Sequence, residues 1–440
     1  MAEVKRDVIY SMLASTLPAL GNFVAVALAL RHMDSVWLGK SYALVSFFFI
    51  AIDLFNFGSA RIFTVEAVRS SVPTLIFLDC LSALGSTAVF APAGILLGRY
   101  GLIAQPEFVI LMVLAPVCYG MSHFSLGALR SCGRSGAICA ISLTSALSRV
   151  LIIVLLTKHR ELDRYLPDLL LLVEAGYGSM LLLTYLQADR KRSPDRLRSG
   201  CSDEVRFDVR AFDFRPFFVR FRNEILGSWY SNAIFSGAKH LDMMLVTLIV
   251  GPAGGSLYRG VKSVHNLAFN CGQGVALLLN RGSRVSMDML FHRPRQINIV
   301  AGALVLVMLA VAASLLACRI RLFPIAVLGS YALQFGIMFV TFAGAMMIFL
   351  CRVLSLLMFS VNRASFVLVS TIEVGLSLVL IGIMSYLFGL LGALLGILVA
   401  STTVMGLSFV LSRHDARKVL IASRSCSILD ADARTENLAK

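Results

Sequence analysis

The sequence predicts an all-α membrane protein with about twelve membrane-crossing helices, arranged as two related lobes of six. Three observations support this fold class. The 440-residue chain is 58% hydrophobic and only 15% charged, whereas soluble domains carry about 25% charged residues. Its apolar residues form twelve stretches, each close to the ~20 residues that a helix needs to cross a bilayer. The lysines and arginines between these stretches are abundant on alternate sides.

The apolar stretches form two sets of six, separated by a polar segment. The first set is expected at residues 8–30, 42–60, 72–97, 108–129, 137–156 and 166–186. The second set is expected at residues 225–250, 257–279, 297–317, 331–350, 366–387 and 390–411. These boundaries predict an N-terminal lobe at 1–186, a linker at 187–224, a C-terminal lobe at 225–412 and a tail at 413–440.

The distribution of basic residues predicts the orientation in the membrane. Placing both termini inside assigns 28 lysines and arginines, Arg352 among them, to the cytoplasmic side and only eight to the other side. Short loops rich in Lys and Arg stay in the cytoplasm. We therefore expect a multi-pass protein of a bacterial inner membrane with both termini cytoplasmic. The run at residues 8–30 is too long for a signal peptide and is interpreted as the first span.

Two pairs of short segments indicate that the halves are repeats. Gly39-Lys40-Ser41-Tyr42 follows the first span, and Gly255-Ser256-Leu257-Tyr258 follows the seventh. The segments 147–152 and 376–381 are identical at five of six positions. Because six is an even number of crossings, both lobes face the same way, as in transporters with parallel repeats.

The eighth span carries the clearest candidate site. Five polar side chains are spaced 3, 4, 4 and 3 residues apart and so share one helix face: Arg259, Lys262, Asn266, Asn270 and Gln273. A polar stripe on a membrane helix should face a water-filled cavity or the protein interior. Cations and amides in that order suit a phosphate or a sugar. The alternative is that the two cations only extend to the membrane interface.

Two further cations lie at membrane depth. Arg149 is near the middle of the fifth span, and either contacts a substrate or pairs with Glu174 of the sixth. Lys239 lies three residues before Asp242 in the seventh span, so the two either form a local ion pair or take part in transport. Together with the stripe, these residues predict a cationic passage between the lobes.

Four carboxylates at membrane depth are candidates for coupling transport to an ion: Asp53, Glu174, Asp242 and Glu373. Membrane-embedded carboxylates relay protons or bind cations in many transporters, and they also pair neighbouring helices. The residues alone leave both roles open.

The linker at 187–224 interleaves arginines with phenylalanines in its second part. Such a segment can lie in the headgroup layer with its guanidinium groups on lipid phosphates. It is interpreted either as a positively charged anchor for the seventh span or as a collector of a phosphorylated substrate.

The sequence lacks the motifs of several functional classes. Gly39-Lys40-Ser41 resembles the end of a phosphate-binding loop, but Asp34 occupies the position of the required glycine. The sequence has no Ser/His/Asp set, no metal-ligand spacing and no paired-cysteine motif. We therefore expect no enzyme, no cofactor, no metal and no catalytic residue. The net charge of +15 is explained by membrane topology, so no nucleic-acid partner is expected.

The chain resembles the bacterial polysaccharide flippases. These are the O-antigen and exopolysaccharide transporters of the multidrug/oligosaccharidyl-lipid/polysaccharide (MOP) superfamily. The resemblance covers residues 8–412. It is carried by Arg31…Gly39-x-x-Tyr42…Asp53-x-x-x-x-Gly58…Arg61, by Asp242…Gly251…Gly255-x-x-Tyr258 and by Gly389-x-x-Gly392.

The resemblance implies a V-shaped pair of six-helix bundles, like that of the related MATE transporters, which alternates between inward-open and outward-open states. It implies a polyprenyl-pyrophosphate-linked oligosaccharide as cargo and a cationic lumen for the pyrophosphate. Membrane lipids, a polysaccharide polymerase and glycosyltransferases are the implied partners. Two alternatives stay open: a cation-coupled multidrug exporter of the same superfamily, and a membrane-bound glycan polymerase, which the short loops at 98–107 and 157–165 disfavour.

Overall fold

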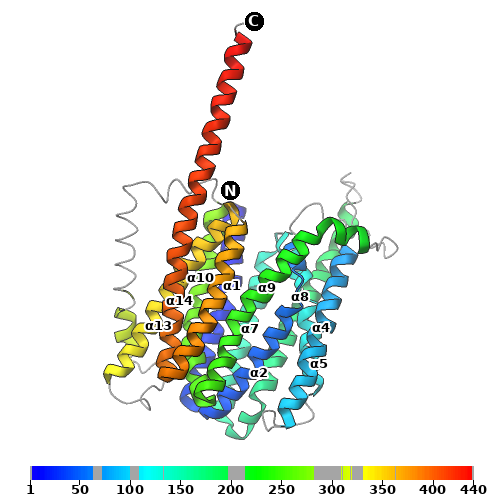
Figure 1. Cartoon of the computed structure of the whole chain (residues 1–440). Coiled ribbons are helices and arrows are strands. Elements are labelled where there is room, and N and C mark those ends of the chain that lie inside the picture. The colour runs from blue at the N-terminus through cyan, green and yellow to red at the C-terminus, as the bar shows by residue number, and fades with distance from the viewer. Residues whose placement is uncertain are drawn as a thin grey trace.

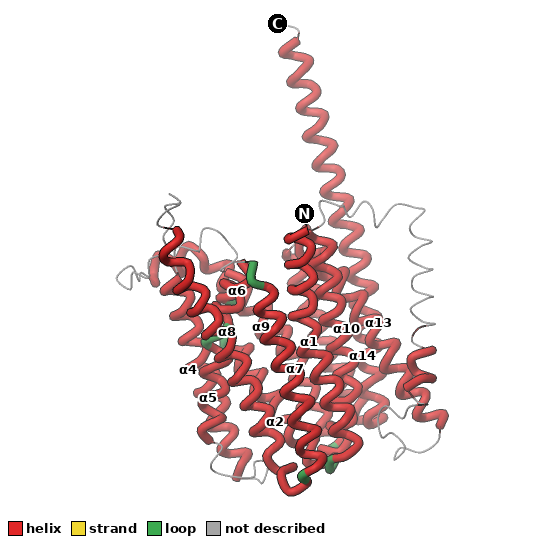
Figure 2. Tube along the Cα trace, turned by 180° about the vertical axis from the view of Figure 1, so that it is seen from behind, coloured by secondary structure: helices red, strands yellow, loops and turns green. Residues whose placement is uncertain are grey.

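The structure is a computed structural model that describes residues 2–62, 72–99, 109–131, 133–196, 214–281, 331–361 and 363–438, with short pieces within 309–319. Among these residues the regular structure is entirely helical, and no strand occurs (Figure 2). The N-terminus and the C-terminal end of the last helix lie toward the same end of the bundle (Figure 1), as an even number of crossings requires.

In the described part of the first half, the chain forms eight α-helices and one short 3-10 helix. They are α1 (Ala2–His32), α2 (Ser35–Leu54), α3 (Ser59–Ile62), α4 (Val72–Arg99), α5 (Val109–Gly120), α6 (His123–Ser131), α7 (Ser135–Lys158), η3 (Arg160–Tyr165) and α8 (Leu166–Arg196). The second half comprises α9 (Phe214–Val250), α10 (Pro252–Arg281), α13 (Tyr331–Val361) and α14 (Arg363–Leu438).

The helices confirm the predicted class of an all-α membrane protein. Among the described residues, eight helical segments are long and apolar enough to cross a membrane. One of them, Val367–Leu411, contains two crossings, because α14 bends back at Gly389. The helices α9 and α10 occupy the positions expected for the seventh and eighth spans. The ninth predicted span, residues 297–317, lies mostly outside the described residues.

Several helix boundaries differ from the predicted ones. The helix α2 begins seven residues early because the Asp34 carboxylate caps it, accepting a hydrogen bond from the Trp37 amide at 2.7 Å. The segment Gly39-Lys40-Ser41, expected between the first two spans, is therefore part of α2. The fourth stretch is broken at Met121 and Ser122, between α5 and α6. Both ends of the predicted linker are helical, since α8 continues to Arg196 and α9 begins at Phe214; residues 197–213 lie outside the described residues.

The two crossings of α14 form a tight antiparallel hairpin. Gly389 adopts φ 59° and ψ −138°, a conformation that residues with a side chain rarely adopt, and it reverses the chain. Beyond this turn, Gly392 lies so close to the Met384 carbonyl that a Cβ would overlap it. Gly396 lies against the Leu380 and Ile381 backbone, where a Cβ would be 2.9 Å away. Small residues thus allow the two arms to pack closely.

The two halves of the chain meet at the end of the bundle where α1 joins α2 and α9 joins α10. The helices α1 and α2 of the first half pack against α9 and α10 of the second. The largest cluster of buried apolar side chains lies toward this end and includes Leu30, Leu38, Leu156, Val246, Tyr258 and Leu390. We call this end the closed end. Toward the opposite end the buried clusters are smaller and separate.

A buried carboxylate holds three helices of the first half together. Asp79 of α4 is 2% exposed. One of its oxygens accepts a hydrogen bond from the Ser59 hydroxyl at the start of α3, at 2.5 Å. The other accepts one from the Phe124 amide in the first turn of α6, at 2.6 Å. Asp79 therefore accepts hydrogen bonds from donors at the N-terminal ends of two short helices, each of which follows a non-helical interruption.

Replacing Asp79 with Ala should destabilise the protein, because both donors would be left buried without an acceptor. An unsatisfied buried donor costs about 1–3 kcal/mol, so with two such donors the free energy of unfolding should fall by about 2–6 kcal/mol. Chemical denaturation of the detergent-solubilised protein measures this loss. Asp34→Ala, which removes an exposed cap from α2, is the matched control. Equal losses for the two variants would contradict the proposed role of Asp79.

Candidate functional site

A cavity of about 480 Å³ lies within the bundle and is lined by α1, α2, α5, α7, α8, α9, α10, α13 and α14. Its wall on α2 runs from Tyr42 to Asp53, which at 1.5 Å per residue spans ~16 Å along the helix. Asp53 is in the last turn of α2, and Tyr42 lies about two turns after its start. The cavity therefore begins below the apolar cluster of the closed end and extends toward the opposite end of α2.

The polar stripe predicted on the eighth span faces this cavity. Four of its members, Arg259, Lys262, Asn266 and Asn270, line the wall. The amide of Asn270 also donates to the Asn266 carbonyl at 2.7 Å. The stripe faces inward because the rest of α10 packs against α1, α2 and α13. The fifth predicted member, Gln273, has a side chain outside the described residues.

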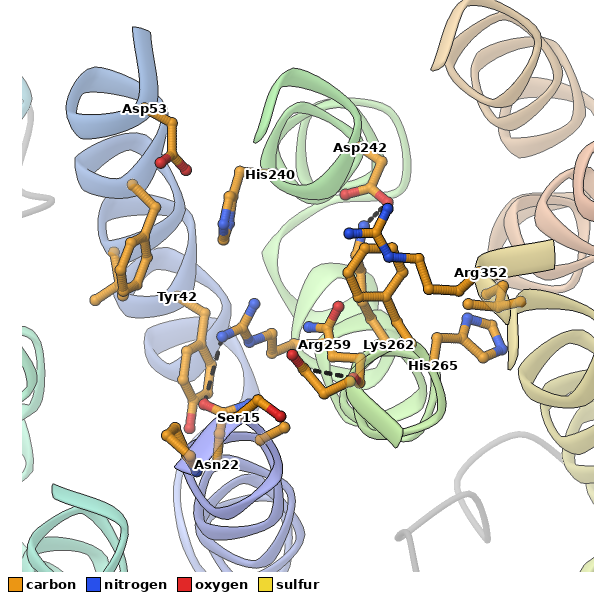
Figure 3. Close-up of a pocket in the computed structure, with 18 of the residues that line it drawn as sticks. Ser15, Asn22, Tyr42, Asp53, His240, Asp242, Arg259, Lys262, His265 and Arg352 are labelled. Atoms are coloured by element: carbon orange, nitrogen blue, oxygen red, sulfur yellow. Dashed lines mark hydrogen bonds and ion pairs between the residues drawn. The ribbon is translucent and has the colours of Figure 1, made fainter. Parts of the chain in front are cut away.

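Arg259 differs from the other side chains of the stripe in its charge environment. It is 5% exposed, and its guanidinium carbon lies 5.1 Å from the centre of the Tyr42 ring (Figure 3). Its Nη2 donates a long hydrogen bond of 3.4 Å to the Asn22 side-chain oxygen. Its Nε and Nη1 find no acceptor among the described residues. Within that part of the chain, no carboxylate forms an ion pair with this buried cation.

Lys262, one helical turn further along, has a carboxylate partner. Its ammonium group pairs with Oδ2 of Asp242 on α9 (Figure 3). The same oxygen accepts a hydrogen bond from the Tyr258 hydroxyl at 2.8 Å. Asp242 therefore forms an ion pair with the neighbouring helix, and the two roles expected for Lys239 stay predictions. The Lys239 side chain itself lies outside the described residues.

Arg149 pairs with Glu174, which was one of its two expected roles. Its Nη2 lies 2.5 Å from Glu174 Oε1, and its Nη1 donates to the Pro18 carbonyl of α1 at 3.2 Å. Both side chains still line the cavity. Arg149 and Glu174 are also close enough to act electrostatically on Arg259. All three side chains, two cations and one anion, line the same cavity.

The remaining predicted carboxylates, Asp53 and Glu373, also line the cavity, from α2 and from the first arm of α14. Their role in ion coupling stays a prediction. Near Asp53 the wall is aromatic: the Phe49 and His240 rings stack with centres 5.1 Å apart. Tyr119 completes this aromatic wall.

Sequence reasoning missed one cation of the site. Arg352 was assigned to a cytoplasmic loop, which was wrong, because α13 runs through it and places it in the cavity wall. It is 7% exposed, and its guanidinium carbon lies 4.3 Å from the centre of the Phe269 ring. The signal was present: Arg352 lies within a mostly apolar run that continues to Val361.

The charge of the cavity differs from the predicted excess of cations. Among the described lining residues, four are basic (Arg149, Arg259, Lys262, Arg352) and four are acidic (Asp53, Glu174, Asp242, Glu373). A charge in a medium of low dielectric is costly unless it is paired, which explains why most of these cations have acidic neighbours. The cationic character is therefore concentrated at Arg259 rather than spread over the whole passage.

Comparisons with known proteins identify the fold. No family model and no curated protein sequence matches the chain. A mutant of the Vibrio cholerae MATE transporter VcmN aligns with 95% of this chain and 99% of its own, with a TM-score of 0.57 and 10% identity. A MATE in complex with MaD3S aligns with 94% of this chain and 96% of its own, with a TM-score of 0.55 and 13% identity.

A third solved structure is a MOP superfamily transporter from Pyrococcus furiosus, described as having a binding pocket of reverse polarity that suggests a different function. It covers 94% of this chain and 95% of its own, with a TM-score of 0.52 and 11% identity. All three matches extend over almost the full length of both chains. At 10–13% identity the likeness establishes architecture alone: the chain has the fold of the MATE transporters of the MOP superfamily.

Proposed function

We propose that this protein is a transporter that moves a polyprenyl-pyrophosphate-linked oligosaccharide across a bacterial inner membrane by alternating access. It catalyses no covalent chemistry. Glycosyltransferases would supply the cargo, and a polysaccharide polymerase would consume it for surface or exopolysaccharide synthesis.

One observation carries the choice of an anionic cargo. Arg259 is a buried cation in the wall of a cavity, it forms no ion pair among the described residues, and two of its nitrogens are free to donate. A guanidinium group presents a planar set of donors that matches phosphate oxygens. A pyrophosphate beside Arg259 would satisfy both the charge and the donors.

The rest of the lining suits a sugar. Hydroxyl and amide groups from several helices face the cavity and can exchange hydrogen bonds with a glycan: Ser15, Asn22, Ser145, Asn232, Asn266, Asn270, Ser377 and Ser401. Aromatic rings such as Tyr119 offer apolar faces to sugar rings. The polyprenyl chain needs no polar site, because it stays in lipid.

The expected orientation in the membrane indicates from which side the glycan enters the cavity. With both termini in the cytoplasm, the α1–α2 connection lies outside, so the closed end is the outer end. The cavity then extends toward the cytoplasm, where the glycan is attached to its lipid. Separation of the apolar cluster at the outer end would release the headgroup outside.

Reconstitution into liposomes tests this function. The full-length protein is incorporated with a fluorescent polyprenyl-pyrophosphate oligosaccharide in the inner leaflet, and an external lectin detects the glycan that reaches the outer leaflet. We expect protein-dependent exposure of the glycan. Equal rates with and without protein would overturn the proposal.

A second candidate function, a cation-coupled multidrug exporter, is favoured by the carboxylates of the same cavity. Asp53 and Glu373 lie in its wall, and Phe49 and Tyr119 would suit a flat apolar cation. Cells that overexpress the protein should then tolerate higher concentrations of cationic dyes. Dye resistance without glycan translocation would favour this second function.

A further inference from the structure

We propose that the Asp242 carboxylate competes with the anionic cargo for Lys262. A pyrophosphate must displace this carboxylate from the Lys262 ammonium group before Lys262 and Arg259 can bind it together. This inference rests on the proposed function and names the residue that sets the affinity for the headgroup. Asp242 therefore limits the binding of the anion instead of forming part of its binding site.

The pair is placed for exchange within the cavity. Asp242 and Lys262 both line it, at 3% and 6% exposure. They come from different helices, α9 and α10, which are joined at Gly251. Lysine is a compact charge with three donors, and it accepts carboxylate or phosphate oxygen without a demanding geometry. One anionic oxygen can therefore replace another on this ammonium group.

Tyr258 makes the exchange reversible. Its hydroxyl donates to the same Asp242 oxygen that holds Lys262. When Lys262 turns to a phosphate, the carboxylate keeps this hydrogen bond and is not left without any partner. Its second oxygen, Oδ1, forms no hydrogen bond with the described residues and can accept one from water that accompanies the headgroup.

The pair formed by Arg149 and Glu174 is different. Arg149 is also fixed by its hydrogen bond to the Pro18 carbonyl, so its guanidinium is held by two helices at once. Lys262 also has a second cation on the same face of its own helix, because Arg259 lies three residues away on α10. Arg149 has no such neighbour on α7. Once released from Asp242, Lys262 and Arg259 would present two adjacent cations to two adjacent phosphates.

The test measures binding of farnesyl diphosphate to the purified full-length protein in lipid nanodiscs. Asp242→Asn removes the competing charge and should tighten binding about tenfold. Asp242→Glu keeps the charge and should stay within about threefold of the wild type. In a Lys262→Gln background, Asp242→Asn should have no effect, because the residue that it releases is absent.

Tyr258→Phe provides an independent test with the opposite sign. Without the hydroxyl, Asp242 depends on Lys262 alone and releases it less readily, so binding should weaken about threefold. This variant keeps the ring and the buried charge pair, and it stays informative if Asp242→Asn fails to fold. An unchanged or tighter affinity for Tyr258→Phe would overturn the proposal.

Two outcomes separate this inference from the proposed function. If the wild type binds farnesyl diphosphate and Asp242→Asn binds it no tighter, the competitor role is wrong and the function stands. If neither the wild type nor any variant binds the probe, the proposed function fails and the inference fails with it. Inorganic pyrophosphate should show the same gain for Asp242→Asn, and a gain confined to the farnesyl compound would count against competition for the diphosphate.

Discussion

Replacing Arg259 with Gln is expected to reduce binding of a polyprenyl diphosphate by about 10- to 100-fold. A hydrogen bond between a charged donor and an anion contributes about 1.5–3 kcal/mol, and each 1.4 kcal/mol is a factor of ten in affinity. Gln keeps a donor and much of the volume but removes the charge. Glycan translocation in liposomes should fall with the affinity, while the amount of protein in the membrane stays constant.

Arg164→Gln is the matched control for this prediction. Arg164 also lies over a tyrosine ring, with its guanidinium carbon 4.9 Å from the centre of the Tyr165 ring, but it is exposed at the closed end. It should have no effect on binding. If Arg259→Gln bound the diphosphate as tightly as the wild type, the main argument for an anionic cargo would be lost. The double variant Arg259→Gln with Lys262→Gln should abolish export altogether.

The second large effect is expected from Gly39→Leu. Gly39 of α2 lies against the first residue of α10, and a Cβ at this position would overlap the Pro252 carbonyl. A leucine side chain would therefore keep α2 and α10 apart at the closed end. Because the obstacle is backbone rather than a movable side chain, the closed arrangement should become inaccessible, and translocation should fall below about one tenth of the wild-type rate.

The state of the closed end can be measured directly. A cysteine at Asn22, introduced after the native cysteines are replaced, should react with a membrane-impermeant thiol reagent added on the closed-end side only when Gly39→Leu is present. Gly375→Leu is the control, since no atom lies within 4 Å of a Cβ at Gly375. Transport at the wild-type rate by the Gly39→Leu protein would show that the two helices need not touch during the cycle.

The sequence alone predicted the helical class, most crossings and the polar wall of α10. These features are local: bilayer thickness fixes the length of an apolar run, and the helical period places residues three or four apart on one face. The spacing of Arg259, Lys262, Asn266 and Asn270 therefore identified a real wall of the cavity.

The partners of these residues could not be predicted in the same way. The sequence offered Lys239 as a local partner of Asp242, because the two lie three residues apart on one helix. It did not indicate the ion pair of Asp242 with Lys262 of the next helix. Such contacts depend on how helices are rotated against one another, which a single sequence does not specify. Arg352 was missed for a related reason, since counting basic residues treats every arginine near a predicted helix end as part of a loop.

The hairpin of α14 has a consequence for how the cavity changes volume. Its two arms share a single turning residue and touch along their backbones at Gly392 and Gly396. The two arms should therefore move as one rigid body, with Glu373 on one arm and Ser401 on the other at a constant separation. A change in the width of the passage must then come from movement between this hairpin and the other lining helices, and not from separation of its two arms.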